Sequence, residues 1–148
     1  MATHDTAVEL RVACLTPRAL MPRKGYGADA GFDLAIPEDH ALPPGATCRI
    51  DLEIVLQIPH GWYGQIFGRS SVFQRGLSVH PGVIDADYRG SVQLLVENRR
   101  SQTLHVQRGE RLAQLLILPV PRVALRHISA AEIESTRRGT GGFGSTGR

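Results

Sequence analysis

Cysteine is scarce in this chain, with only Cys14 and Cys48 among 148 residues. The two lie far apart and form no Cys-x-x-Cys pair, which excludes a disulfide framework or a zinc site of the usual ligand spacing. The six histidines contain no His-x-x-x-His pair either. We therefore expect two free thiols that pack as small hydrophobic groups, and no transition metal bound by protein side chains alone.

Long apolar runs are also missing. No stretch reaches the roughly 18 consecutive apolar residues that a membrane-spanning helix needs. The first residues, MATHDTAVEL, are polar and acidic and lack the apolar segment of a signal peptide. A net charge of +3 is too small to indicate a nucleic-acid-binding protein by itself. We expect a cytoplasmic protein without membrane or nucleic-acid partners.

Alternation of apolar and polar residues dominates the remaining sequence. It predicts strands over residues 8–15, 47–58, 62–67, 91–98, 111–120 and 122–128. Sixteen glycines and nine prolines separate these segments, a pattern typical of a β-sandwich, jelly roll or barrel. Two short helices are predicted: one over 70–76 with serine caps and a closing glycine, the other over 129–135 with a capping box of Ser129 and Glu132. The predicted fold class is all-β.

The end of the chain has a composition of its own. Residues 136–148, TRRGTGGFGSTGR, are mostly glycine, serine, threonine and arginine, with Phe143 as the single aromatic residue. Such a segment cannot bury enough apolar surface to fold by itself. We predict a β domain over 1–135 and a Gly-rich arm over 136–148 that becomes ordered on binding; the alternative is a disordered tail.

Some short stretches carry residue types suited to chemistry. They are AGFDL (30–34), GRSS (68–71), GVIDADYRG (82–90), RGERLAQLL (108–116) and RRGTGGFGSTG (137–147). In GRSS, Arg69 and two hydroxyls at the start of a helix suit an anion. Gln114 interrupts an apolar strand and needs a polar partner. In GVIDADYRG the residue types alone do not distinguish Asp85 from Asp87 as the reactive acid, and each stretch taken singly also fits a structural role.

In this order, the five stretches resemble the five motifs of the trimeric deoxyuridine triphosphatases (dUTPases), from about residue 25 to the C-terminus. The sharpest likeness is an aspartate three residues before a tyrosine in a hairpin, together with a terminal Gly-Phe-Gly-Ser-Thr-Gly. The resemblance implies a jelly-roll-like β-barrel with a flexible C-terminal arm. It also implies hydrolysis of dUTP to dUMP and pyrophosphate by attack of water on the α-phosphate. Such an activity limits uracil incorporation into DNA and supplies dUMP for dTMP synthesis.

The resemblance further implies Mg²⁺ on the triphosphate and a homotrimer whose three chains share each active site. Asp85 matches the catalytic acid that positions and deprotonates the attacking water. Tyr88 matches the residue whose ring packs under the deoxyribose and excludes a 2′-hydroxyl. The main chain of Gly82, Val83 and Ile84 would then pair with the uracil edge.

Matching the motifs also assigns the remaining contacts. The phosphate-binding residues would be Arg69, Ser70, Ser71, Gln114, Arg138, Gly144, Ser145 and Thr146. Phe143 would stack on uracil, and Asp33 would hold the waters around Mg²⁺, a cation that keeps several waters and prefers substrate phosphates.

The sequence departs from the family pattern at two positions. Ser71 stands where many members have glycine, and no asparagine occurs near Val79, where many bacterial members use one to read uracil. Base recognition is therefore expected to rest more on the backbone.

Two alternative functions fit the sequence less well. A dCTP deaminase of the same fold would need a glutamate at the position of Leu95. A non-catalytic trimer that senses deoxynucleotides would not need the complete catalytic set.

Overall fold

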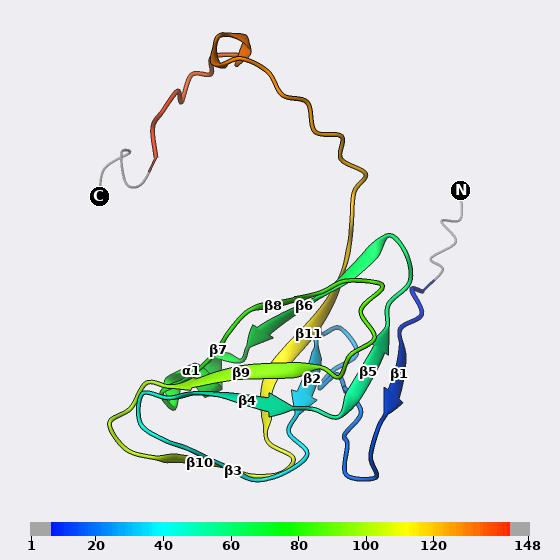
Figure 1. The fold of residues 1–148 in the computed structure, drawn as a ribbon, viewed down its shortest axis with the longest axis vertical. Helices are drawn as coiled ribbons and strands as arrows, with labels where there is room; N and C mark the ends of the chain where they lie inside the picture. Colours follow the sequence, from blue (N-terminus) through cyan, green and yellow to red (C-terminus); the bar gives the residue numbers. More distant parts are fainter. Residues whose placement is uncertain (1–6, 143–148) are drawn as a thin grey trace.

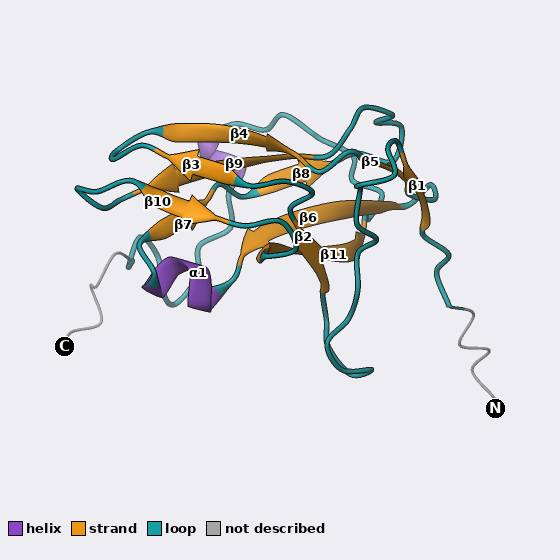
Figure 2. Cartoon of the chain, turned by 90° about the horizontal axis from the view of Figure 1, so that it is seen from below, coloured by secondary structure: helices purple, strands orange, loops and turns teal. Residues whose placement is uncertain are grey.

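The computed structural model describes residues 7–142, which form an antiparallel, nearly all-β jelly roll (Figures 1 and 2). The strands are β1 (Arg11–Cys14), β2 (Phe32–Ala35), β3 (His40–Leu42), β4 (Thr47–Asp51), β5 (Ile54–Gln57), β6 (Trp62–Gly68), β7 (Leu77–Val79), β8 (Gly82–Ile84), β9 (Gln93–Asn98), β10 (Leu104–Val106) and β11 (Arg111–Pro119). One short helix, α1 (Ser70–Gln74), and one 3₁₀ turn, η1 (Ala130–Glu132), accompany them. The predicted fold class is confirmed.

Four antiparallel sheets make up the body. Their strand orders are β2-β11-β6-β8, β4-β9-β7, β1-β5 and β10-β3. Strand β11 lies inside the largest sheet and pairs with β6 from Ala113–Gly68 to Pro119–Trp62. On its other edge β11 pairs with β2, where the register shifts between Arg111 and Ala113. This arrangement brings the stretches AGFDL, GRSS and RGERLAQLL to neighbouring strands.

The core lies between the sheets and explains the alternation seen in the sequence. In β9, for example, every second side chain is buried, because successive side chains of a strand point to opposite faces. The fully buried residues come from several sheets and include Leu34, Ile50, Ile66, Leu94, Val96, Leu112 and Leu115. Burial of each large aliphatic side chain contributes about 1.5–3 kcal/mol.

The strand predicted over 47–58 is in fact two strands, β4 and β5, separated by a turn at Glu53. Glu53 has a φ of 57°, an uncommon conformation for a residue with a side chain. Its carboxylate accepts hydrogen bonds from Arg18 Nε, at 2.9 Å, and from the hydroxyl of Thr16. The bond from Arg18 and then the bond from Thr16 hold the pKa of Glu53 below its ordinary value. A side-chain network thus stabilises a turn that the apolar pattern does not reveal.

The predicted helices are confirmed as shorter elements. Helix α1 ends before Gly76, whose φ of 95° suits a glycine that closes a helix. The predicted serine caps are wrong, because Arg69 is the N-cap and Ser70 is already helical. In η1 the capping box is present, and hydrogen bonds from Ser129, first from its backbone, lower the pKa of Glu132.

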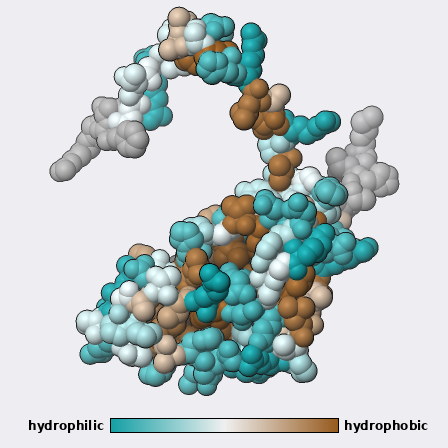
Figure 3. All heavy atoms as spheres, in the orientation of Figure 1, coloured by the Kyte–Doolittle hydropathy of each residue, from teal (hydrophilic) through white to brown (hydrophobic). Residues whose placement is uncertain are grey.

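The segment after β11 leaves the body of the domain (Figure 1). The strand predicted over 122–128 is wrong for this chain, since the segment pairs with no strand in the described part of the structure. Two of its apolar side chains are strongly exposed, Leu125 at 97% and Val123 at 73%, while Ile128 is half-buried. Figure 3 shows apolar side chains along the segment outside the body of the domain. The division between a domain over 1–135 and an arm over 136–148 stays a prediction. Within residues 7–142, no helix has the length and hydropathy of a membrane span.

Candidate functional site

Asp33 of β2 lies at the centre of a cluster of charged and polar side chains. Arg69 Nε lies 3.3 Å from its Oδ1, and Arg111 Nη1 donates to its Oδ2 at 3.0 Å. Gln114 of β11 is the direct cross-strand partner of Asp33, so the two side chains share one face of the sheet. The Asp33 side chain is only 16% exposed. Two guanidinium groups therefore flank the one carboxylate of Asp33.

The local sequence around Asp33 fixes this position. The backbone of Asp33 donates to the carbonyl of Arg23 at 2.6 Å and accepts from the N–H of Arg23 at 3.2 Å. A β-carbon at Gly31 would lie 3.1 Å from Gln114 Oε1 and 3.2 Å from Leu116 Cδ1. Glycine at this position thus leaves room for the Gln114 amide beside the carboxylate.

Helix α1 begins beside the same cluster. The N–H of Arg69 donates to the carbonyl of Leu112 at 3.3 Å, and Arg69 Nη1 donates to the carbonyl of Arg111 at 3.3 Å. Ser70 and Ser71 follow, and both are exposed. Because α1 has only five residues, the affinity of this corner for anions rests on the guanidinium groups more than on a helix dipole.

Two arginines hold the other end of α1. Arg99 Nη2 donates to the carbonyl of Phe73 at 3.1 Å, and Arg100 Nη2 donates to the carbonyl of Gln74 at 3.2 Å. These bonds satisfy carbonyls that the end of a helix leaves without partners. Both ends of the helix are therefore tied to neighbouring segments.

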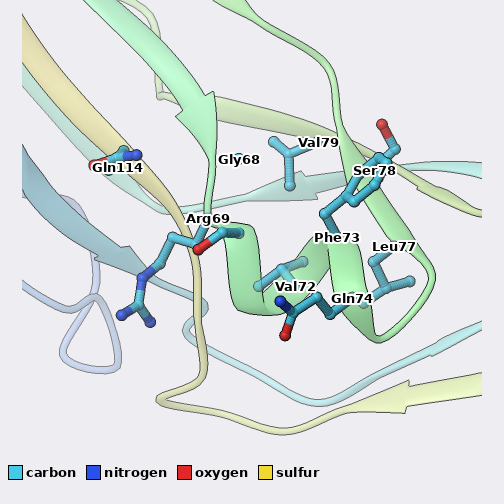
Figure 4. Close-up of a pocket in the computed structure, with 10 residues that line it drawn as sticks. Gly68, Arg69, Val72, Phe73, Gln74, Leu77, Ser78, Val79 and Gln114 are labelled. Atoms are coloured by element: carbon cyan, nitrogen blue, oxygen red, sulfur yellow. The ribbon is translucent and has the colours of Figure 1, made fainter.

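The cluster opens into two adjoining cavities. One, of about 570 Å³, is lined by Asp33, Arg111 and Tyr26. The other, of about 540 Å³, extends along α1 toward Phe73, as Figure 4 shows. Both cavities are lined by three of the predicted phosphate ligands: Arg69, Ser70 and Gln114.

The hairpin GVIDADYRG forms a second group of predicted site residues. Strand β8 pairs with β6, and Gln65 Nε2 donates to the carbonyl of Gly82 at 3.1 Å. A small cavity of about 170 Å³ is lined by Gly82, Val83, Ile84 and Tyr88. The structure therefore brings together the predicted base-binding backbone and the predicted deoxyribose-binding ring.

The turn after β8 positions the predicted catalytic acid. The N–H of Tyr88 donates to the carbonyl of Asp85 at 3.1 Å, which closes the turn, and the Asp85 side chain is exposed. The phenol of Tyr88 donates to the carbonyl of Ser91 at 3.0 Å. Gly90 is required beside this ring, because a β-carbon there would lie 2.5 Å from Tyr88 Cζ. Within the described chain, the hairpin cavity shares no lining residue with the two cavities at Arg69.

Some of the other predicted site residues lie outside the described part of the chain. Arg138 is exposed, and its Nε donates to the carbonyl of Gly141 at 2.7 Å. Phe143, Gly144, Ser145 and Thr146 lie outside the described residues. Val79 is 7% exposed and lies against Gly68, where a β-carbon would be 3.2 Å away, so it acts here as a core residue.

The sequence reasoning did not single out Arg111. This residue opens β11 and reaches Asp33 across the sheet. The signal for it was its place in RGERLAQLL, three residues before Gln114. The structure thus adds one guanidinium to the predicted set.

The residues present suit a magnesium ion that is held mainly by the phosphates of a bound nucleotide and by water. No group of three or more His, Cys, Asp or Glu side chains placed to hold a metal occurs among the described residues. Asp33 and Asp29 both line the charged cavity and offer carboxylate oxygens, the ligand type that Mg²⁺ prefers. This donor set is too small for an all-protein cage and fits an ion that arrives on phosphates with its waters.

Comparison with known proteins agrees with this geometry. The sequence profile of the dUTPase family matches residues 18–147. The deoxyuridine 5'-triphosphate nucleotidohydrolase of Debaryomyces hansenii is 35% identical over 147 residues, which cover 99% of this chain and 92% of that protein.

Two solved structures extend the similarity to the fold. A mutant dUTPase of Staphylococcus bacteriophage 80alpha with dUpNHpp has a TM-score of 0.87 and 27% identity, covering 95% of this chain and 99% of that one. A mutant dUTPase from phage phi11 of S. aureus, which coordinates a structural Mg(II) ion, has a TM-score of 0.78 and 26% identity, covering 84% and 99%. The match of the family profile over nearly the whole chain, the curated relative and the shared fold place this protein in the dUTPase family.

Proposed function

We propose that this protein hydrolyses dUTP to dUMP and pyrophosphate. The observation that carries the proposal is the Asp33 cluster, in which Arg69, Arg111 and Gln114 converge beside two open cavities. Membership of the dUTPase family supports the substrate, and a named relative acts on deoxyuridine 5'-triphosphate.

The Asp33 cluster is suited to a triphosphate. Guanidinium groups are good partners for phosphate oxygens, since they donate in a fixed planar fork. Arg69 and Arg111 would exchange part of their contact with Asp33 for contacts with the phosphates, while the Gln114 amide donates a further hydrogen bond. Transfer at phosphorus depends chiefly on positioning and on neutralisation of charge, and this cluster provides both.

Magnesium fits the same cavity, with Asp33 as the residue that would hold its waters. When bound, the ion supplies further positive charge along the triphosphate. The protein groups supply the remaining positioning through Arg69, Ser70 and Gln114.

The hairpin would supply the chemical step. Asp85 accepts a proton from a water molecule, whose oxygen attacks the α-phosphorus; the bond to the bridging oxygen of the β-phosphate breaks, and pyrophosphate leaves with that electron pair. Tyr88 would lie against the deoxyribose, and the main chain of Gly82, Val83 and Ile84 would face uracil. The exposure of Asp85 leaves its carboxylate accessible to water.

We also propose a homotrimer in which each active site is shared. In support, the described chain presents the phosphate cluster and the hairpin as separate cavities, and the segment after β11 leaves the body with its apolar residues exposed. Residues 136–148 would close the site from another chain. A cytoplasmic location remains part of this proposal.

The decisive test measures pyrophosphate release in the presence of Mg²⁺ from dUTP, dCTP, dTTP and UTP in parallel, with the base of each product identified. Turnover confined to dUTP supports the proposal. Release of a deaminated product from dCTP would favour the deaminase, although Leu95 offers no acid for that reaction. Binding of dUTP without turnover of any nucleotide would favour a sensor.

The shared site is tested by sedimentation and by truncation. We expect the 16.1 kDa chain to sediment as a trimer. Truncation after Ser135 should leave a folded oligomer with little activity, because the Gly-rich segment is removed. A fully active monomer, or full activity after truncation, would contradict the shared site.

A further inference from the structure

The predicted base-binding backbone begins at a weakly held end of the sheet. Strand β8 has only three residues, and it is the outer strand of the four-stranded sheet in the described part of the chain. The residue before it is Pro81, which has no N–H to donate to a neighbouring strand. Gly82 opens the strand and has no side chain to pack against its neighbours. The peptide that carries the Gly82 carbonyl therefore needs a further contact to keep one orientation.

The side chain of Gln65 supplies this contact. Gln65 lies in β6 and is the direct cross-strand partner of Val83. Its Nε2 donates to the carbonyl of Gly82 at 3.1 Å and to the carbonyl of Ile66 at 3.3 Å, so the amide joins the backbones of the two strands. Gln65 is half-buried and is not among the described residues that line the hairpin cavity. It therefore acts on the cavity through the Gly82 carbonyl.

The orientation of this peptide decides which base the cavity can bind. The Gly82 carbonyl and the Val83 N–H belong to one planar peptide unit, so a contact that fixes the carbonyl also fixes the N–H. A carbonyl oxygen has two lone pairs, and the one that Gln65 does not use remains available to a base. Uracil presents an oxygen acceptor and an N–H donor where cytosine presents an amino donor and a nitrogen acceptor. Backbone groups held in one direction therefore complement one base and repel the other.

We propose that Gln65 is a positioning residue for base selection, whose amide holds the peptide between residues 82 and 83 in the orientation that favours uracil over cytosine. This inference rests on the proposed function and deepens it, because it names the side chain that orients the base-binding backbone. Tyr88 lines the same cavity, but its phenol is held by the carbonyl of Ser91. A change at Gln65 should therefore alter the choice of base and leave the choice of sugar unchanged.

The test measures the Kd values of dUMP, dCMP and UMP on the full chain by calorimetry. Gln65→Met keeps the length of the side chain and removes the donor. The Kd of dUMP should rise about fivefold, the effect of one hydrogen bond between neutral groups. The preference for dUMP over dCMP should fall by the same factor, because dCMP does not use the oriented peptide. The preference for dUMP over UMP should stay the same, because both nucleotides carry uracil.

Two further variants separate the donor from the shape of the side chain. Gln65→Arg is the matched control, since arginine carries an N–H donor at the same position along the side chain, and it should keep the wild-type preference. Gln65→Asn keeps the amide but is one methylene too short to reach Gly82, and it should lose the preference as Gln65→Met does. Urea titrations would verify that each variant is folded, and Gln65→Asn provides the same test if Gln65→Met does not fold.

The outcomes separate this inference from the proposed function. Wild-type protein that binds no dUMP, or that binds dUMP and dCMP equally, would refute the proposed function and this inference with it. A wild-type preference for dUMP over dCMP that persists in Gln65→Met and Gln65→Asn would overturn only the role of Gln65. An equal loss of all three nucleotides in these variants would also overturn it, because Gln65 would then act on the shape of the hairpin rather than on the choice of base.

Discussion

Replacing Gly90 by alanine tests how closely the hairpin is built around Tyr88. The backbone of Gly90 lies outside the left-handed region, so alanine adds no backbone strain there. Its β-carbon would nevertheless lie 2.5 Å from Tyr88 Cζ and 2.9 Å from Cε2, closer than carbon atoms approach in proteins. The ring must therefore move, and the hydrogen bond from the phenol to the carbonyl of Ser91 is lost.

The expected effects on stability and on catalysis differ in size. Loss of one exposed hydrogen bond costs about 1 kcal/mol of unfolding free energy at most. Displacement of a ring that positions the deoxyribose should lower kcat/KM for dUTP about tenfold, or ~1.4 kcal/mol of transition-state stabilisation. Selectivity for dUTP over UTP should fall as well, because the displaced ring no longer occupies the space of a 2′-hydroxyl.

Initial rates of pyrophosphate release from dUTP and UTP, with a parallel urea titration, would measure both effects. Gly27→Ala is the matched control, since a β-carbon at Gly27 meets nothing within 4 Å. Tyr88→Phe removes the hydrogen bond but keeps the ring, and should retain most of the selectivity. Unchanged kcat/KM and unchanged selectivity in Gly90→Ala would refute the role assigned to the ring.

Further changes test the catalytic acid and two structural contacts. Asp85→Asn should abolish turnover while dUTP still binds, and near-normal turnover would refute its role as the base. Gly76→Ala should destabilise the fold by about 1–3 kcal/mol. The φ of 95° is strained for alanine, and the β-carbon would lie 2.6 Å from Arg100 Cγ. An unchanged urea midpoint would contradict this expectation. Glu53→Gln should destabilise the protein at neutral pH, because Arg18 holds the pKa of Glu53 below its ordinary value. A carboxyl of lowered pKa stabilises the fold above its unfolded pKa and loses this effect as the pH falls through its folded pKa. The deficit should therefore shrink in urea titrations as the pH falls below the ordinary pKa of a glutamate, and a constant deficit would contradict this.

The longer strands could be predicted because their burial follows the sequence pattern. Residues 91–98 alternate between buried and less buried side chains over enough positions to give a clear signal, and 62–67 do so in part. In 111–120 the signal was the apolar run itself, since Leu112 and Ala113 are both buried beside the register shift. Strands of three residues, such as β7 and β8, are too short for periodicity to show. The break between β4 and β5 was missed because it depends on Glu53 and its contact with Arg18, which is distant in sequence.

The site was predictable through motifs and only in part through residue types. The order of short stretches identified Asp33, Arg69 and Gln114, and the structure brings these three together. Arg111 was missed, since an arginine at the start of a strand is an ordinary feature of a sequence. Its importance follows from its contact across the sheet with Asp33.

The apolar residues of the strand predicted over 122–128 are explained, in the proposed trimer, by contacts with another chain rather than by contacts within one chain. Val123 and Leu125 lie two residues apart, with the small Ala124 between them and an arginine on either side, and large apolar side chains at this spacing are typical of a strand with one buried face. A strand also needs a partner that satisfies its backbone, and in a single chain this segment has left the sheets. Exposing these apolar side chains is unfavourable in water, and a second copy of the chain would remove that cost. The apolar pattern that failed as a prediction for one chain therefore supports the proposed trimer.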